Sequence, residues 1–312
     1  MKRAVITGPT GVVGSALVRA LSRAGTELLL LVREGSPNNA RIRAISEELM
    51  KEGAPPIIMR ECSLHHMRDM ENDTGVTYDV FYHLSWGGTK GKDRFDPYIH
   101  NKNVEYALDA AALAKRLGCS CFVGAGSQAE YGRSDARLSP DTPTHPENAY
   151  GIAKLCAGQM TREYAHMLGM RHVWTRILSV YGPNDGEKTL ITYLVNSLLH
   201  GERPAMTAGG QIWDYVYSED AAEALAAVGE RGKDGETYLI ASGQERTLKE
   251  YVLELREVLA PDAEIGFGEI PYGERQVMNL TADISKTTED TGWVPRISFA
   301  EGIKRMAGRK VM

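Results

Sequence analysis

The first fourteen residues place a glycine-rich loop between a strand and a helix. Ala4–Thr7 is a short run typical of a buried strand, and Gly8–Gly14 follows it with the pattern G-x-x-G-x-x-G. Apolar residues then recur at helical spacing through Gly14–Ala24. In such a loop one glycine permits a tight turn, one lets the backbone approach an anion, and one lets the helix pack closely on the strand. Free N–H groups at the helix start favour negative charge, so this segment predicts a dinucleotide site contacted by Gly8, Thr10, Gly11, Val12, Val13 and Gly14.

Short apolar runs alternate with helical segments through the first half of the chain. Strands are expected at 28–32, 57–59, 80–84, 121–125 and 173–178, and helices at 42–50, 107–117, 149–168 and 189–199. Alternation of this kind requires right-handed crossovers between parallel strands. The sequence therefore predicts an α/β fold, a Rossmann-type doubly wound parallel sheet with helices on both faces.

The last third of the chain has a different character. It is richer in turns, and its strand signals are short and separated. We expect a smaller, partly discontinuous C-terminal substrate lobe, formed by about 179–213 and 244–312. Residues 1–178, together with about 214–243, then form the dinucleotide-binding domain.

Composition narrows the classes of function. The 312 residues carry a net charge of −5 with both signs scattered, which argues against a nucleic-acid partner. No stretch approaches the ~20 apolar residues of a membrane span and the N-terminus has no signal-peptide pattern, so a cytoplasmic protein without a membrane partner is expected. The four cysteines form no C-x-x-C, and no His/Cys spacing suggests zinc, so free thiols and no metal are expected.

The residues after the second expected strand bear on the choice of cofactor. A site that prefers NAD usually offers Asp or Glu there to the ribose 2′-hydroxyl. Here Val32 is followed by Arg33, which could pair with a 2′-phosphate, and Ser36 could hydrogen-bond to the same group. Glu34 could instead serve the ribose. NADP(H) is therefore favoured, with NAD(H) as the alternative.

Tyr150 and Lys154 form a Y-x-x-x-K pattern within an expected helix. Residues four apart lie on one helix face, so the ammonium is expected beside the phenol. A free tyrosine has a pKa near ~10, and a nearby cation favours the phenolate, which suits the residue to exchange a proton with a substrate oxygen. Ser127 follows the strand at 121–125, and ligands sit at the carboxyl ends of such strands. Ser127, Tyr150 and Lys154 are therefore the expected catalytic residues.

Together these features resemble the extended short-chain dehydrogenase/reductases, and in particular their nucleotide-sugar epimerases, dehydratases and 4-ketoreductases. The resemblance runs over nearly the whole chain and is carried by the glycine loop, 81–84, 103–104, 127–132, 176–183, 214–221 and 292–295. It implies a nucleotide-diphospho-sugar substrate and a homodimer formed through the two long helices near 101–117 and 149–168. It also implies that the cofactor is contacted by Leu84, Ser85, Asn103, Tyr150, Lys154 and Leu178.

Departures from the family's pattern narrow the reaction. The family's sugar 4,6-dehydratases carry an Asp-Glu pair after the catalytic Ser or Thr, whereas this chain has Gln128 and Ala129, neither of which exchanges protons. A dehydratase of that type is not expected. The family often holds the diphosphate with Asn and Arg at the positions of Ser179 and Trp213, while Arg275 matches another of its arginines. Substrate contacts are therefore expected from Ser127, Gln128, Ser179, Trp213 and Arg275.

Several functions are compatible with this set of residues. An NADPH-dependent reductase of a nucleotide-linked 4-keto-6-deoxy sugar is favoured by Arg33 and by the missing dehydratase acids. An NAD-dependent nucleotide-sugar 4-epimerase would use the same catalytic residues without net consumption of cofactor. A non-catalytic cofactor sensor is a minor alternative, because it would need the glycine loop but neither Tyr150 nor Lys154. A reductase of smaller carbonyl compounds is the remaining alternative.

Overall fold

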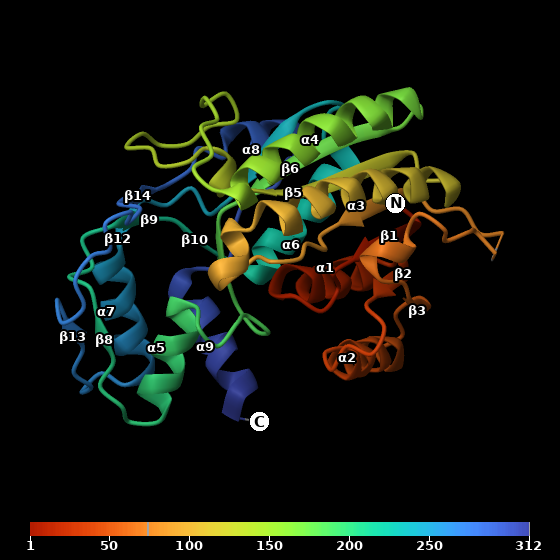
Figure 1. The fold of residues 1–312 in the computed structure, drawn as a ribbon. Coiled ribbons are helices and arrows are strands. Elements are labelled where there is room, and N and C mark those ends of the chain that lie inside the picture. Colours follow the sequence, from red (N-terminus) through yellow and green to blue (C-terminus); the bar gives the residue numbers. More distant parts are fainter. Residues whose placement is uncertain (74, 312) are drawn as a thin grey trace.

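The computed structural model describes residues 1–73 and 75–311, and a seven-stranded parallel sheet forms its centre (Figure 1). The strand order is β11-β6-β5-β4-β1-β2-β3. Because the chain builds outward from β1 on one side and then returns to build on the other, this is the order of a doubly wound Rossmann sheet, as the sequence predicts. The strands are β1 (Arg3–Thr7), β2 (Glu27–Val32), β3 (Ile57–Glu61), β4 (Val80–His83), β5 (Cys121–Ser127), β6 (Arg171–Ile177) and β11 (Thr237–Ile240).

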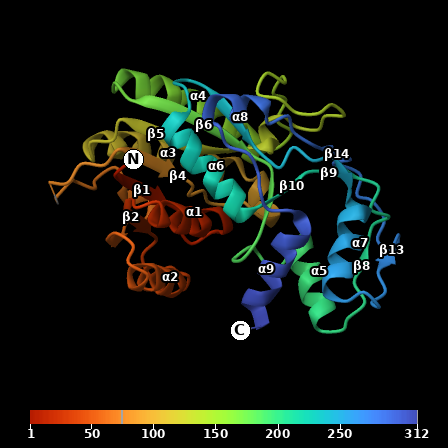
Figure 2. The same cartoon turned by 180° about the vertical axis from the view of Figure 1, so that it is seen from behind.

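Helices cover both faces of this sheet. One face carries α1 (Val12–Arg23), α2 (Asn39–Lys51) and α6 (Ser218–Arg231), and the other carries α3 (Pro97–Arg116) and α4 (Ala149–Met167). The paired helices α3 and α4 lie in front in Figure 1, whereas α1 and α6 come to the front in Figure 2. Ala4 and Ile6 of β1 pack in the core under α1, and Val5 packs in the core under α3. Burial on both faces explains why the inner strands are continuous apolar runs.

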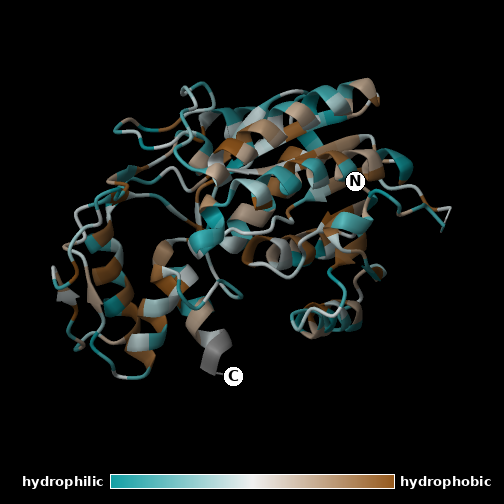
Figure 3. Ribbon diagram, viewed as in Figure 1, coloured by the Kyte–Doolittle hydropathy of each residue, from teal (hydrophilic) through white to brown (hydrophobic). Residues whose placement is uncertain are grey.

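A second group of elements lies beyond the carboxyl ends of the strands. It contains α5 (Leu190–Leu199), α7 (Leu248–Leu259) and α9 (Phe299–Val311), with the short strands β8 (Ala205–Met206), β9 (Ile212–Trp213), β12 (Arg246–Thr247), β13 (Gly266–Phe267) and β14 (Asn279–Leu280). Hydrophobic and hydrophilic residues are interleaved along α5 and α7 in Figure 3, and the hydrophobic ones share a core that includes Leu194, Tyr251 and Ile303. The parallel pair β7 (Ser179–Tyr181) and β10 (Tyr215–Tyr217) connects this group to the sheet, and α8 (Ser285–Thr291) packs on α6 and β11.

One difference from the expected elements concerns the start of α3. The apolar pattern predicts a helix from residue 107, but α3 begins ten residues earlier, at Pro97. Asp96 caps the helix by accepting hydrogen bonds from the backbone N–H groups of Tyr98 (2.8 Å) and Ile99 (3.2 Å), and proline suits the first helical position. The first turns carry polar residues, so capping reveals this boundary and apolar spacing does not.

Within the described residues, no helix is both long and apolar enough to span a bilayer.

Candidate active site

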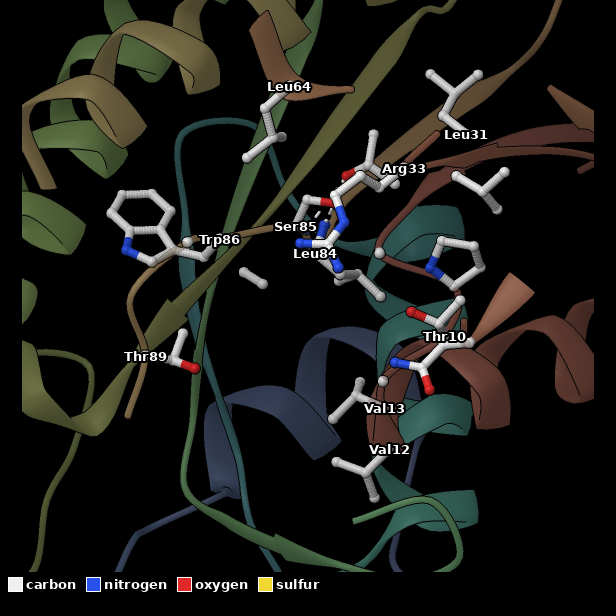
Figure 4. A pocket seen from close by; sticks show the side chains of 18 of the residues that line it. Thr10, Val12, Val13, Leu31, Arg33, Leu64, Leu84, Ser85, Trp86 and Thr89 are labelled. Carbon is white, nitrogen blue, oxygen red and sulfur yellow. Dashed lines mark hydrogen bonds between the residues drawn. The ribbon is translucent and has the colours of Figure 1, made fainter. Parts of the chain in front are cut away.

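A cavity of about 620 Å³ opens at the carboxyl ends of β1, β4, β5 and β6. It lies where the chain switches direction between β1 and β4, which is the usual ligand position in an open α/β sheet. Figure 4 shows side chains that line this hollow, among them Thr10 and Val13 of the glycine loop and helix, Arg33 after β2, and Ser85 after β4. Leu178, which follows β6, also lines it.

The glycine loop forms one wall of the cavity, and two of its glycines are required by close packing. Gly8 has φ +71°, and a side chain there would lie 2.9 Å from the backbone nitrogen of Ser85. A side chain at Gly14 would collide with the carbonyl oxygen of Gly8. Gly11 is different, because a side chain there would make only an ordinary contact, 3.9 Å from the carbonyl oxygen of Gly8, and it precedes the first turn of α1. Backbone N–H groups at this helix start are therefore accessible to an anion.

The far end of the cavity is positively charged. Arg33 is exposed and lines the cavity together with Ser36, whereas Glu34 does not. Arg41 donates a hydrogen bond to the carbonyl oxygen of Thr10 at 2.6 Å, which brings a second guanidinium to the glycine loop. None of the described residues that line the cavity is acidic. Arg41 is not among the expected contacts, because it lies inside a helix that the sequence marks only by its apolar face.

His83 lies beneath the glycine loop and is held neutral. The hydroxyl of Thr7 accepts hydrogen bonds from the backbone N–H groups of Leu84 (3.1 Å) and Ser85 (3.2 Å), so its proton is available to Nδ1 of His83 at 3.1 Å. Burial lowers the pKa of His83 to about 3. Its role is therefore to join β1 to β4 at the cavity floor.

Three expected catalytic residues meet at the opposite wall. Asn148 caps α4 by accepting a hydrogen bond from the N–H of Gly151 at 2.9 Å, which sets Tyr150 in the first turn of the helix. The Ser127 side chain, at the end of β5, hydrogen-bonds to Tyr150. Burial raises the pKa of Tyr150, and the Ser127 hydrogen bond opposes that shift. Ser127, Tyr150 and Lys154 all line the cavity.

Lys154 lies one helical turn from Tyr150 and is almost completely buried. Its ammonium donates a hydrogen bond to the carbonyl oxygen of Ala125 at 2.5 Å and lies 3.9 Å from the centre of the Trp86 ring. The centre of the Tyr150 ring is 5.9 Å away. Burial lowers the pKa of Lys154 to about 7. The pair therefore shares a cavity wall, and the lysine can exist with or without its proton near neutral pH.

A buried carboxylate holds Ser127 in place. Glu130, in the 3₁₀ turn η3 (Gln128–Glu130), accepts hydrogen bonds from the backbone N–H of Ser127 (2.8 Å) and from the guanidinium of Arg176 (2.8 Å). The indole N–H of Trp174 also donates to it. Glu130 is completely buried, so this charge depends on the arginine for compensation. The sequence shows both residues only as members of family motifs, and their pairing is a result of the fold.

The other expected substrate contacts lie apart from this wall. A second cavity of about 380 Å³ is lined by Trp213 and by Gln211, Tyr193 and Lys188. The indole N–H of Trp213 donates a hydrogen bond to the hydroxyl of Ser179 at 2.8 Å. Gln128 is half-buried and Arg275 is exposed, and neither lines one of these two cavities.

Asn103 supports the loop after β4 from the start of α3. Its side-chain carbonyl accepts a hydrogen bond from the N–H of Gly87 at 2.9 Å, and its amide donates to the carbonyl oxygen of Gly87 at 3.0 Å. It is buried and is absent from the described lining of the cavity. In this structure Asn103 therefore shapes the loop that carries Ser85 and Trp86.

The sequence matches the family model described as "NAD dependent epimerase/dehydratase family" over residues 4–241. The chain belongs to this family. The matched segment contains the glycine loop, Ser127, Tyr150 and Lys154. The protein is accordingly an NAD(P)-dependent enzyme of the extended short-chain dehydrogenase/reductase type.

Individual proteins resemble the chain along its length. CDP-abequose synthase of Salmonella typhimurium is 23% identical, and the alignment covers 98% of this chain and 97% of that protein. UDP-glucuronic acid 4-epimerase of Bacillus cereus, solved with UDP-glucuronic acid and NAD, has a TM-score of 0.82 at 20% identity and covers 99% of this chain and 100% of its own. RMD from Pseudomonas aeruginosa, solved with NADPH, has a TM-score of 0.81 at 19% identity, with coverages of 99% and 98%. At these identities the two solved structures show a shared fold.

Proposed function

We propose that the protein is an NADPH-dependent reductase of a nucleotide-linked 4-keto-6-deoxy sugar. The observation that carries this proposal is the pairing of Tyr150 with Ser127 on the wall of a cofactor cavity whose described lining has no carboxylate. Gln128 and Ala129 follow Ser127, so the acid and base needed for elimination of water are absent from those positions. Proton exchange with a sugar oxygen remains, and it suits the reduction of a carbonyl group.

The cavity fits a dinucleotide with a 2′-phosphate. Gly8 and Gly14 allow the close backbone packing that forms the loop, and the N–H groups at the start of α1 suit a pyrophosphate. Arg33 would pair with the 2′-phosphate, with Arg41 close to the same edge and Ser36 as a hydrogen-bond partner. Contacts further along the cofactor are proposed from Leu84, Ser85, Asn103, Tyr150, Lys154 and Leu178.

NADPH, when bound, would supply the hydride that reaches the sugar carbonyl carbon. Ser127 would orient the carbonyl oxygen by a hydrogen bond, and Tyr150 would give its phenolic proton to that oxygen as the alcohol forms. Lys154, with a pKa near 7, can return a proton to the site from solvent. The products are then one hydroxy-sugar and one NADP⁺.

The substrate would extend from this wall into the second lobe, which we assign to about 179–213 and 244–312. Its cavity has aromatic and amide side chains suited to a nucleotide base and sugar, including Trp213 and Gln211. Ser179, Gln128 and Arg275 remain proposed substrate contacts. The similarity to CDP-abequose synthase supports a nucleotide-linked sugar.

A second candidate is an NAD-dependent nucleotide-sugar 4-epimerase, which the likeness to the Bacillus cereus enzyme with NAD favours. Both reactions place a sugar oxygen between Ser127 and Tyr150. An epimerase must return the hydride that it removes, so it consumes no cofactor. A reductase gives its hydride once and then exchanges the spent cofactor.

The test uses nucleotide-linked 4-keto-6-deoxyhexoses and NADPH deuterated at the transferable hydrogen. We expect deuterium at sugar C4 and one NADP⁺ for each product molecule. Interconversion of two hydroxy-sugars with retained NAD⁺ and no net oxidation would establish the epimerase instead. The Tyr150→Phe protein is the control for chemistry outside this site.

A further inference from the structure

The loop between β4 and α3 places a cation directly over the proposed acid. Arg94, in the 3₁₀ turn η2 (Gly91–Phe95), has its guanidinium carbon 4.2 Å from the centre of the Tyr150 ring. The lysine of the Y-x-x-x-K pattern is more distant, with Nζ of Lys154 at 5.9 Å. Arg94 lies outside the recognised motifs, in a loop that the sequence marks only as polar.

The position of Arg94 is fixed by hydrogen bonds to its own backbone and to the loop. The indole N–H of Trp86 donates to Nδ1 of His100 at 3.2 Å, so Nε2 of that ring carries the proton and donates to the carbonyl oxygen of Arg94 at 3.2 Å. The guanidinium donates to the carbonyl oxygen of Thr89 at 3.4 Å. Asp96 closes the turn by capping α3. This arrangement holds the arginine over the ring from outside the cavity.

The groups around Tyr150 differ in charge and in how directly they face it. Ser127 of β5 hydrogen-bonds to it, and the rings of Trp86 and His100 meet it edge-on at 6.3 and 5.6 Å. The Lys154 ammonium is directed to the carbonyl oxygen of Ala125 and the face of Trp86. Glu130 is the negative group nearby, and it is paired with Arg176. Arg94 therefore provides the nearer of the two cations that stand over the Tyr150 ring.

We propose that Arg94 is a positioning residue that stabilises the phenolate of Tyr150. A guanidinium over an aromatic face attracts the neutral ring weakly and the anionic ring strongly, because the phenolate spreads its charge into the ring. Burial raises the pKa of Tyr150, whereas the hydrogen bond with Ser127 and the charge of Arg94 both lower it. The catalytic meaning of this role rests on the proposed function, but the electrostatic effect does not.

Removing Arg94 makes Tyr150 a weaker acid. In a reductase, Tyr150 becomes a phenolate when it gives its proton to the carbonyl oxygen, so loss of the cation slows this transfer. The limb of the pH–rate profile on which activity falls as the phenol ionises moves to higher pH. A merely structural role for Arg94 would change the rate without moving that limb.

The direct test follows the ionisation of position 150 without any substrate. Tyr150→3-fluorotyrosine is introduced into the otherwise unchanged chain, and its ¹⁹F shift is titrated with pH. The same label is placed in Arg94→Gln, Arg94→Lys and Lys92→Gln proteins. Lys92 is the matched control, because it is an exposed cation in the same turn.

We expect the midpoint to rise by about one pH unit in Arg94→Gln, which is a tenfold fall in the ratio of phenolate to phenol at fixed pH. Arg94→Lys keeps a cation and should shift by less than half as much, and Lys92→Gln should not shift. An unchanged midpoint in a folded Arg94→Gln protein overturns the proposal. If Arg94→Gln does not fold, the Arg94→Lys protein decides. A rise of its midpoint by about one pH unit or more overturns the proposal as well. If the midpoint shifts as expected but the protein reduces no ketosugar, the effect of Arg94 on Tyr150 stands. The proposed reductase function is then wrong.

Discussion

At the scale of single residues, His83 and Tyr150 are two buried ionisable groups whose surroundings give them different roles. His83 accepts a hydrogen bond from the Thr7 hydroxyl and stays neutral at physiological pH, because burial lowers its pKa to about 3. Tyr150 faces the cavity, and the Ser127 hydroxyl is its neighbour. His83 therefore cannot act as a general acid or base near neutral pH, whereas Tyr150 can.

Replacing Tyr150 by Phe tests this assignment. The ring and its contacts with Trp86 and Arg94 remain, so folding and cofactor binding should survive. Turnover should fall by ~10²-fold or more, the usual scale for loss of a general acid. Steady-state kinetics with a ketosugar measure the turnover, and a titration with NADPH measures cofactor binding separately. Tyr164→Phe, on the same helix, is the control, and a near-normal rate for Tyr150→Phe would make that residue an ordinary helix tyrosine.

The cofactor preference is also decided by a single side chain. Charge-assisted hydrogen bonds from Arg33 to a 2′-phosphate, worth ~1.5–3 kcal/mol, should give roughly a ten- to hundredfold preference for NADPH over NADH. Arg33→Ala should remove most of it, whereas Arg43→Ala, an exposed cation on α2, should not. Dissociation constants of NADPH and NADH from fluorescence titration measure this preference. Equal affinities in the unmutated protein would favour Glu34 as a ribose ligand.

At the scale of elements, an aromatic stack crosses the sheet beneath α3 and α4. His172 of β6 stacks on Phe122 of β5 at 5.9 Å and on Trp174 at 6.1 Å. Its Nε2 meets the hydroxyl of Thr161 at 3.0 Å. Burial, with smaller effects of neighbouring positive groups, lowers its pKa to about 3, whereas the unfolded chain has the ordinary value near ~6.5.

This depressed pKa makes the sheet sensitive to acid. As pH falls below ~6.5 the unfolded chain gains the proton first, so the contribution of His172 to stability is present above that pH and is lost towards about 3. His172→Phe should make the fall of the unfolding free energy shallower by about 1.4 kcal/mol per pH unit in that window. Urea unfolding at several pH values measures the slope. His65→Phe is the exposed control, and equal slopes for His172→Phe and the wild type would contradict this account.

Elements that are buried on both faces can be predicted from the apolar pattern of this sequence, whereas helix starts set by capping and contacts over long range cannot. The glycine loop and the run Leu28–Val32 carry their own signals, because packing on two sides demands continuous apolar residues. The first turns of α3 depend on Asp96 and Pro97, and α6 is rich in small alanines that give little periodic contrast. Arg94 reaches Tyr150 only because the loop after β4 folds back over α4. The local sequence pattern contains no information on the contact between Arg94 and Tyr150.

At the scale of the whole molecule, α3 and α4 leave an apolar surface uncovered. Met160 and Met167 of α4 are 44% and 82% exposed, and a hollow beside them is also lined by Leu108 and Ala112 of α3. The two helices lie side by side along one face of the sheet (Figure 1). Patches of this kind mark contacts with another protein, and a second copy would bring four helices together across a twofold axis. This surface supports the homodimer that the family resemblance implies.

A charge placed in this surface tests the homodimer. Met160→Glu would bury one carboxylate from each copy at a shared contact, and desolvation of unpaired charges costs several kcal/mol, enough to shift a micromolar dimer to monomers. Met50→Glu, on the exposed side of α2, is the matched control. Sedimentation velocity at micromolar concentration should give twice the mass of the chain for the wild type and Met50→Glu, and a single chain for Met160→Glu. Because Tyr150 lies in the first turn of α4, well before Met160, the monomer should still bind NADPH. A wild-type protein with the mass of one chain would show that α3 and α4 are not an interface between copies.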